Sequence, residues 1–256
     1  MSVGAVTARG VLAKVPAITA FFWIIKVLAT TVGETFADYL NETLGLGLNG
    51  TSLVMGGALV VALFVQFVTK KYITVVYWVT IVLISVAGTL ITDTLTDGYG
   101  VPLIVSTMVF GLLLAVTFTV WYAKEKTLAM KSITTWQREA FYWLAILFTF
   151  ALGTALGDYL AETLALGYGN SVLVYGGALA LVVVAWRMRW LGEITAFWIA
   201  YILTRPLGAS IGDLLSQSTK DGGLGLGTTL TSVVFLGAIL VAVSYLAISK
   251  RDVLKA

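Results

Sequence analysis

Acidic side chains recur at fixed spacing in this sequence, and binding of a hard cation is the chemistry that they fit. Four aspartates are each followed, four residues later, by a second polar side chain, and one further glutamate precedes the first pair by four residues. The pairs are Asp38 and Glu42, Asp93 and Asp97, Asp158 and Glu162, and Asp213 and Gln217, with Glu34 as the preceding glutamate. A spacing of four places two side chains on one face of a helix. Carboxylate oxygens are the ligands that Ca²⁺, Mg²⁺ and Mn²⁺ prefer.

Other common site chemistries are excluded by composition. The 256 residues contain no cysteine and no histidine. Disulfides, thiolate or imidazole metal ligands, cysteine nucleophiles and histidine bases are therefore impossible. The sequence has no nucleophile constellation and no cofactor motif, so we expect no enzymatic activity and no organic cofactor, only a bound divalent cation.

The elements that carry these acids are predicted to be membrane-spanning helices. Hydrophobic residues make up 59% of the chain and charged residues only 11%, whereas soluble domains carry roughly 25% charged residues. Eight apolar segments are long enough to cross a bilayer of about 30 Å. They cover about 18–42, 51–69, 73–95, 101–123, 139–163, 170–190, 194–217 and 228–249. We therefore expect an all-α membrane protein with a single transmembrane domain over residues 1–256.

The distribution of basic residues predicts the orientation of this domain. Basic residues follow the even-numbered spans, whereas the loops after the odd-numbered spans are glycine-rich and acidic, with Lys220 as their one basic residue. The positive-inside rule then places both termini in the cytoplasm, which suggests a multi-pass protein of the bacterial cytoplasmic (inner) membrane. Trp121, Tyr122 and Trp190 at span ends fit an interfacial aromatic belt. The net charge of +3 gives no reason to expect nucleic-acid binding; the expected surroundings are the lipid bilayer.

The chain contains a four-fold internal repeat. Residues 20–59 align without gaps with residues 140–179, and each odd-numbered span carries a glycine five residues before its aspartate and a tryptophan fifteen residues before it. The glycines are Gly33, Gly88, Gly153 and Gly208, and the tryptophans are Trp23, Trp78, Trp143 and Trp198. The units cover about 15–70, 71–125, 135–190 and 191–250, and the basic loop at about 124–138 joins the two halves. A two-helix unit returns the chain to one side, so the repeats are parallel and related by a pseudo-four-fold axis along the membrane normal. All four aspartates must then lie at one depth.

Three segments carry a resemblance to a known family. They are Lys26-Val27-Leu28-Ala29-Thr30-Thr31-Val32-Gly33-Glu34, Gly88-Thr89-Leu90-Ile91-Thr92-Asp93 and Tyr201-Ile202-Leu203-Thr204-Arg205-Pro206-Leu207-Gly208-Ala209-Ser210. The chain resembles a bacterial family of polytopic membrane proteins built from four copies of a repeat of unknown function, described as uncharacterised membrane-anchored proteins. The resemblance covers nearly the whole chain and implies this architecture, but it implies no activity.

The repeated acids have a simpler alternative interpretation. Each aspartate lies about 18–21 residues from the basic end of its span, or roughly 27–31 Å along the helix, so the acids could simply solvate the outer helix ends. Two arguments favour a cation. An acid near a helix C-terminus opposes the macrodipole, and gathered carboxylates repel one another unless a cation or a proton neutralises them.

Small residues in the odd-numbered spans predict close helix packing. The residue before each aspartate is Ala37, Thr92, Gly157 or Gly212, and it lies four positions after the repeated glycine. This small-xxx-small pattern lets helix backbones approach each other. Gly56-Gly57-Ala58, Gly176-Gly177-Ala178, Gly111 and Gly237-Ala238 are predicted to form the matching flat surfaces on the even-numbered spans.

Two cations lie deep in predicted spans and are candidates for ion pairing or gating. Lys26 either has a partner in the membrane or extends to the interface, and Arg205 either serves the ion path or forms a structural ion pair. Pro206, which follows Arg205, is expected to kink or break its helix. Thr30, Thr31, Ser85, Thr149 and Thr204, together with Gln217, are weaker candidates for a polar path, because Ser and Thr in membrane helices often bond their own backbone.

These features support one leading function. We expect a transporter or permeation path for a small hard cation, with Mn²⁺, Mg²⁺ or Ca²⁺ ahead of Na⁺. Asp38, Asp93, Asp158 and Asp213 would be direct ligands, and Glu34, Glu42, Asp97 and Glu162 would surround them or carry protons. The alternatives are a proton-coupled exporter of organic cations and a membrane scaffold or regulator that transports nothing. The sequence leaves the oligomeric state open.

Overall fold

The computed structural model describes residues 13–253, which form eight long helices and, within this range, no strand. The helices are α1 (Ala20–Asp38), α2 (Gly47–Val68), α3 (Thr74–Asp93), α4 (Leu103–Glu125), α5 (Trp136–Asp158), α6 (Tyr168–Arg187), α7 (Glu193–Ser216) and α8 (Thr228–Ser249). Each is long and apolar enough to cross a membrane. The predicted all-helical membrane fold with eight spans is therefore confirmed.

Three of the odd-numbered helices end in a π-helical turn. At the residue after Asp38, Asp93 and Asp158, the α-helix continues as a single π-helical turn, which covers Tyr39–Thr43 (η1), Thr94–Gly98 (η2) and Tyr159–Thr163 (η4). A short 3₁₀ turn, Met130–Ser132 (η3), lies in the basic loop between the halves. Isolated π-helical turns are rare and occur frequently at functional sites.

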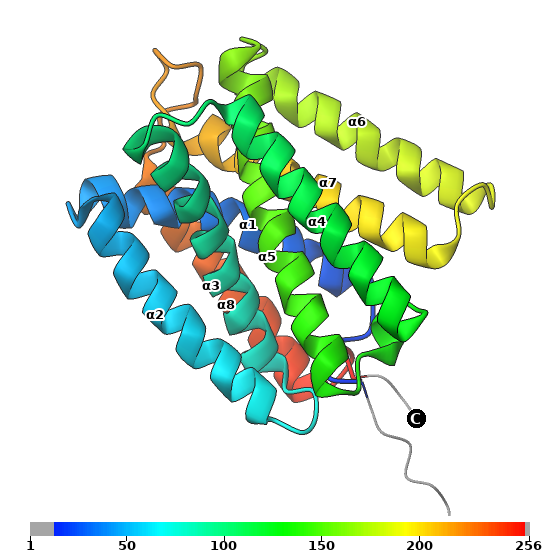
Figure 1. The fold of residues 1–256 in the computed structure, drawn as a ribbon. Helices are drawn as coiled ribbons and strands as arrows, with labels where there is room; N and C mark the ends of the chain where they lie inside the picture. Colours follow the sequence, from blue (N-terminus) through cyan, green and yellow to red (C-terminus); the bar gives the residue numbers. More distant parts are fainter. Residues whose placement is uncertain (1–12, 254–256) are drawn as a thin grey trace, which may run out of the picture.

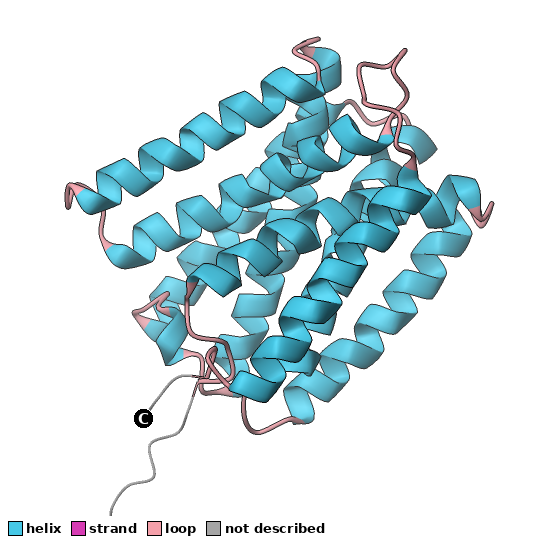
Figure 2. Ribbon diagram, turned by 180° about the vertical axis from the view of Figure 1, so that it is seen from behind, coloured by secondary structure: helices cyan, strands magenta, loops and turns pink. Residues whose placement is uncertain are grey.

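The eight helices form an inner ring and an outer layer. In the inner ring α1 packs on α3, α3 on α5, α5 on α7, and α7 on α1. Each outer helix packs mainly on the inner helix of the next unit: α2 on α3, α4 on α5, α6 on α7, and α8 on α1. The outer position of α2, α4 and α6 is visible in Figure 1, and the loops gather at the two ends of the bundle in Figure 2. This closed order of contacts is what four parallel two-helix units around one axis require.

The repeated glycines make the contacts that close the ring. A Cβ at Gly33 would lie 1.9 Å from Ser85 Oγ, and one at Gly208 would lie 1.9 Å from Thr30 Oγ1. The other two glycines show the same relation: a Cβ would lie 2.6 Å from Phe150 Cβ at Gly88 and 2.2 Å from Arg205 Cγ at Gly153. In every case the neighbour is the residue seven positions after the tryptophan of the next unit. The predicted close packing through small residues is confirmed on the inner helices.

An aromatic layer repeats the same cyclic pattern toward the basic end. The residue before each repeated tryptophan is aromatic, and it contacts the tryptophan of the next unit. Ring centroids are 5.7 Å apart for Phe22 and Trp78, 5.6 Å for Tyr77 and Trp143, 6.3 Å for Tyr142 and Trp198, and 5.7 Å for Phe197 and Trp23. Such aromatic pairs add stability beyond their area burial, so this layer joins all four inner helices.

The glycines of the outer helices do not form the predicted packing surfaces. A Cβ at Gly56, Gly57, Gly176, Gly177 or Gly237 would meet nothing within 4 Å, and one at Gly111 would only touch Leu152 at 3.9 Å. The prediction for these positions was wrong because the inner helices close the ring with their own glycines. The outer helices are left with one side facing away from the bundle.

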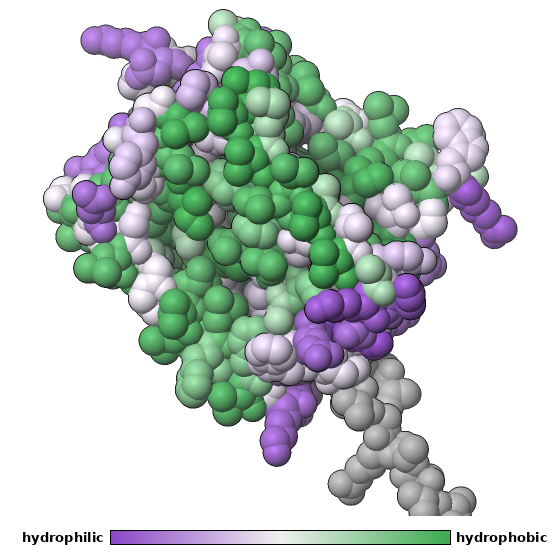
Figure 3. Space-filling view, viewed as in Figure 1, coloured by the Kyte–Doolittle hydropathy of each residue, from purple (hydrophilic) through white to green (hydrophobic). Residues whose placement is uncertain are grey.

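The outward surface is largely apolar. Leu53 and Phe64 on α2 and Ile248 on α8 are among the large hydrophobic side chains that are exposed. Figure 3, viewed as in Figure 1, shows a broad hydrophobic surface over the face of the bundle that is turned toward the reader. A soluble protein rarely exposes a contiguous apolar surface of this extent, whereas lipid tails cover it. Trp121 was predicted to lie in the interfacial belt, but it is fully buried, because its ring packs against the aromatic layer: it stacks on Phe141 and contacts Trp198.

Candidate cation site

A cavity of about 550 Å³ lies among the ends of the inner helices, at the end of the bundle opposite the basic loops. Side chains from all four repeats line it. The lining includes every predicted acid, namely Glu34, Asp38, Glu42, Asp93, Asp97, Asp158, Glu162 and Asp213, together with Gln217. The parallel arrangement of the repeats explains this convergence, since equivalent residues of parallel units lie at one depth.

The π-helical turns determine how the acidic pairs enter the cavity. Asp38, Asp93 and Asp158 are each the last residue of an α-helix, and the second acid of each pair lies within the following π-helical turn. The fourth unit differs, because α7 continues beyond Asp213 as a regular helix to Ser216. Its Gln217 reaches across the cavity mouth, where Nε2 donates to Asp38 Oδ2 at 3.5 Å.

Three carboxylates come closest together. One oxygen each from Glu34, Asp158 and Asp213 can be chosen so that all three lie within 4.8 Å of one another. Oxygen ligands of Ca²⁺ lie about 2.3–2.6 Å from the ion, so a single cation could contact all three. Glu34, predicted to support the ligands, thus lies beside two predicted ligands, whereas Asp38 and Asp93 line the cavity outside this triplet.

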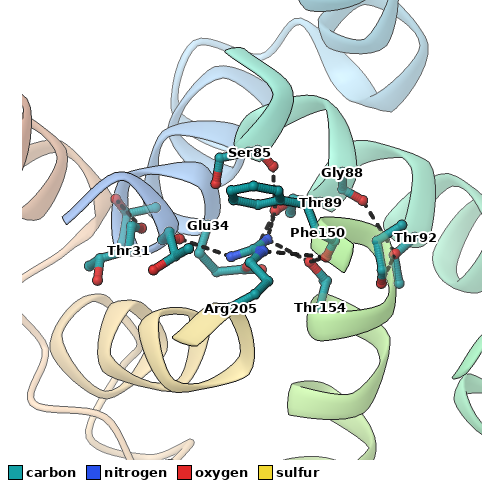
Figure 4. Close-up of polar contacts among 12 residues, drawn as sticks. Thr31, Glu34, Ser85, Gly88, Thr89, Thr92, Phe150, Thr154 and Arg205 are labelled. Atoms are coloured by element: carbon teal, nitrogen blue, oxygen red, sulfur yellow. Dashed lines mark hydrogen bonds and ion pairs between the residues drawn. The ribbon is translucent and has the colours of Figure 1, made fainter. Parts of the chain in front are cut away.

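Arg205 does not itself line the cavity but is bonded to Glu34, which does. The Arg205 side chain is fully buried and donates hydrogen bonds to all three other inner helices (Figure 4). The acceptors are Glu34 Oε2 at 3.0 Å, the carbonyl oxygens of Thr30 at 2.9 Å and Phe150 at 3.4 Å, and the hydroxyls of Thr89 and Thr154. Arg205 therefore forms an ion pair across the bundle with Glu34.

The repeat explains why these side chains meet. Glu34, Thr89 and Thr154 each follow the repeated glycine of their unit. The equivalent residue in the fourth unit, Ala209, is apolar. Arg205, one turn earlier on the same helix, supplies the polar group of that unit instead. Three equivalent positions thus converge on one guanidinium. Thr89 and Thr154 were not among the predicted site residues, although aligning the four units at the glycine would have indicated them.

The Lys26 side chain does not extend to the membrane interface, which was one of its two predicted arrangements. It is fully buried, and its Nζ lies 4.1 Å from the ring centroid of Tyr201 and 4.6 Å from that of Phe150. Among residues 13–253 Nζ has no hydrogen-bond acceptor. The interfacial alternative was wrong, because the surrounding inner helices enclose the whole side chain. Cation–π contacts, rather than an ion pair, surround its ammonium group.

Pro206 does not break its helix, since α7 runs without interruption from Glu193 to Ser216. Proline removes one backbone donor, but neighbouring polar groups occupy this region: Thr204 Oγ1 donates to Tyr201 O at 2.9 Å, and Thr30 Oγ1 donates to Thr204 O at 3.3 Å. The ring itself fits because it faces Gly153, where a Cβ would lie 3.0 Å from Pro206 Cδ.

The weaker candidates for a polar path lie outside the lining of the cavity, except Gln217. Thr30, Thr31, Thr149 and Thr204 each donate to a backbone carbonyl three or four residues earlier. Ser85 Oγ is buried without a partner in the described chain and packs against Gly33. Their hydroxyls are therefore largely used in local helix bonds.

The basic end of the inner ring is closed by a segment for which no role was predicted. Residues 13–16 are buried there, before the start of α1. Lys14 Nζ pairs with the buried Glu139, which also accepts from Gln66 Nε2 at 3.1 Å. The Lys14 amide donates to Ile133 O at 2.9 Å. The bundle is thus open at its acidic end and sealed at its basic end.

A second polar contact fastens the C-terminal residues to the same end. The amide of Ala17 donates to the carbonyl of Asp252 at 2.7 Å, and Tyr72 donates its hydroxyl to Asp252 Oδ2 at 2.5 Å. Burial and this hydrogen bond raise the pKa of the Tyr72 phenol above its ordinary value. The phenol therefore remains a proton donor to Asp252 at physiological pH.

Comparison with known families agrees with the four-unit architecture. A family described as Repeat of Unknown Function (DUF347) matches four times, at residues 21–72, 76–127, 141–189 and 196–252. The chain belongs to this family. Each match covers one inner helix and the outer helix that follows it. No curated protein and no solved structure matches the chain, so the family membership describes the architecture and leaves the function to the site.

Some residues of the site were missed in the sequence. Asn41, Thr96, Tyr168 and Asp221 also line the cavity. Asn41 and Thr96 lie in the π-helical turns, and Asp221 lies in the irregular loop between α7 and α8, where Ser218 Oγ donates to it at 2.6 Å. Asn41 and Thr96 share one repeat position, three residues after the aspartate, where the other units have Ala161 and Ser216. That position carries no acid in any unit, and a recurring acid is the signal that identified the others.

Proposed function

We propose that the protein transports a small hard cation through the acidic cavity, with a divalent metal such as Mn²⁺, Mg²⁺ or Ca²⁺ as the substrate. The observation that carries the proposal is the approach of Glu34, Asp158 and Asp213 within 4.8 Å of one another, inside a cavity lined by further carboxylates. Glu34 is paired with Arg205, but Asp158 and Asp213 have no ion-pair partner among residues 13–253. Carboxylates at such distances repel strongly in a partly desolvated site, so a cation or protons must neutralise them.

The composition of the lining favours a metal ion over an organic cation. An organic cation would need aromatic or aliphatic surface beside the acids. The residues that line the cavity are mostly carboxylates, amides and hydroxyls, and Tyr168 is the aromatic residue among them. Oxygen-only donors are those of hard divalent cations.

The arrangement along the axis supports a carrier rather than an open pore. Below the cavity lie Arg205, then Lys26, then the aromatic layer and the seal around Lys14 and Glu139. Two positive charges and a packed aromatic layer oppose passage of a cation through a static structure. Transport would therefore require the basic end to open while the acidic end closes. In this proposal the basic end faces the cytoplasm of a bacterial inner membrane, following the positive-inside rule.

The test combines binding with transport. In detergent, a cation that binds the folded protein raises the thermal midpoint, with a free-energy gain of RT ln(1 + [L]/Kd). We expect one divalent cation to stabilise the protein selectively and to enter proteoliposomes that contain it. The conservative variants Asp158→Asn and Asp213→Asn should lose both effects.

The control is Glu125→Gln, which removes a carboxylate at the basic end, outside the cavity. It should keep both effects. Stabilisation by divalent cations that persists in the Asp158→Asn, Asp213→Asn double variant would overturn the assignment of the site. Selective binding without any flux would instead overturn transport and favour a scaffold or regulator.

A further inference from the structure

A groove of about 760 Å³ on the outside of the bundle is separate from the acidic cavity. It lies between α1, α6 and α7, toward the basic end. Its floor includes Ala196, Ala200 and Thr204, which are spaced by four along α7 and present little side-chain bulk. Its walls are apolar, with Trp23 and Val27 from α1 and Leu179, Val182, Val183 and Trp186 from α6.

The outer position of α6 creates this groove. α6 packs mainly on α7 and η4 and lies along the outside of the bundle in Figure 1. The space between α6 and α1 is therefore open to the side, where the bilayer surrounds the protein. Along α7 it extends from Glu193 to Thr204, which at 1.5 Å per residue is about 16 Å. This is about half of a hydrocarbon core of about 30 Å, the depth of one leaflet.

The mouth of the groove carries two opposite charges that do not neutralise each other. Lys131, in the loop before α5, and Glu193, in the first turn of α7, both line it, and both are exposed. Among residues 13–253 neither takes part in an ion pair. A ligand that fits this mouth carries a negative and a positive group, each able to form a charge-assisted hydrogen bond.

We propose that this groove binds one molecule of phosphatidylethanolamine from the bilayer. An acyl chain fills the apolar groove, the phosphate contacts Lys131, and the primary ammonium donates to Glu193. A choline headgroup has no N–H to donate to Glu193, and an anionic headgroup without an ammonium places its charge beside the carboxylate. The proposal rests on the groove and its mouth alone and is independent of any transport.

The test is lipid binding by the full chain. Protein purified in detergent is exchanged against phosphatidylethanolamine, phosphatidylcholine or phosphatidylglycerol with identical acyl chains, and bound lipid is counted by native mass spectrometry. We expect one tightly retained molecule, with phosphatidylethanolamine preferred at least several-fold over both competitors. Glycerophosphoethanolamine, which has the headgroup but no chains, should not compete, because the apolar groove supplies most of the binding.

Variants separate the two parts of the site. Glu193→Gln should abolish the preference over phosphatidylcholine while lipid is still retained. Ala200→Leu narrows the floor of the groove and should release the lipid, whereas Ala180→Leu, on the exposed side of α6 outside the groove, is the matched control and should retain it. The double variant Lys131→Glu, Glu193→Lys keeps both charges at the mouth and should restore the preference.

Three results would overturn the proposal. The first is equal retention of the three lipids by the unaltered protein. The second is an unchanged preference in Glu193→Gln. The third is lipid retained in Ala200→Leu as in Ala180→Leu, with both variants monodisperse and helical by circular dichroism.

Discussion

The two buried cations of the inner ring are expected to respond in opposite ways to the same substitution. Arg205 is paired with Glu34 and bonded to all three other inner helices, whereas Lys26 has no hydrogen-bond acceptor within residues 13–253. Replacing either by methionine removes a charge and leaves a flexible apolar side chain of comparable length. Only Arg205→Met leaves a partner behind, because the Glu34 carboxylate, 5% exposed, loses its counterion.

The size of the effect follows from the burial of the pair. Removing one member of a buried ion pair costs about 3–5 kcal/mol. For a chain of this size each kcal/mol shifts the thermal midpoint by about 2–4 °C, so Arg205→Met should lower it by roughly 6–20 °C. Lys26→Met removes a desolvated charge that has no ion-pair partner among the described residues, so it should leave the midpoint unchanged or raise it.

The assay is thermal unfolding in detergent, followed by circular dichroism. The double variant Glu34→Gln, Arg205→Met removes both charges and should recover much of the loss, which a double-mutant cycle measures directly. Equal shifts for Arg205→Met and Lys26→Met, or losses that simply add in the double variant, would refute the reasoning that the Glu34–Arg205 pair is the decisive contact.

Three further outcomes test other parts of the structure. Gly208→Ala should lower the thermal midpoint by several degrees, because its Cβ would lie 1.9 Å from Thr30 Oγ1, whereas Gly177→Ala, with nothing within 4 Å, should leave it unchanged or raise it slightly; similar losses would contradict the close packing. Divalent-cation stabilisation should weaken on acidification, since protons compete for the same carboxylates, and a response independent of pH would argue against carboxylate ligands. The chain has no cysteine, so Ser85→Cys provides a single thiol inside the ring. Adding Glu139→Gln weakens the contact with Lys14 and should free residues 13–16, so a thiol reagent should label the thiol of Ser85→Cys faster from the basic side. An unchanged labelling rate would show that residues 13–16 do not control access to the ring.

Much of the site's composition could be predicted because helix geometry converts sequence spacing into depth. The rise per residue is constant, so equivalent residues of parallel units must lie at one level. On this basis Asp38, Asp93, Asp158 and Asp213 were expected to share a depth, and they line one cavity. The irregular loop that contributes Asp221 has no such rule, and it could not be predicted.

The rotation of each helix about its own axis was beyond the sequence. It determines that Glu34, rather than Asp38 or Asp93, lies beside Asp158 and Asp213. The contacts between each repeated glycine and the inner helix of the next unit set that rotation, as in the contact of Gly153 with Arg205. Many rotations satisfy the same apolar pattern when a helix is hydrophobic on all sides, because lipid and protein interior are then equally acceptable surroundings.

The sequence by itself thus determined the number of spans, the four-fold repeat and the level of each acid along the axis. The tertiary structure decided which charges pair, as with Glu34 and Arg205, and which have no partner within the described chain, as with Lys26. It also decided which end of the bundle is sealed. The physical reason is that spacing along a helix is a local property of the backbone. Pairing between helices depends instead on side chains from distant parts of the chain packing without overlap around a common axis.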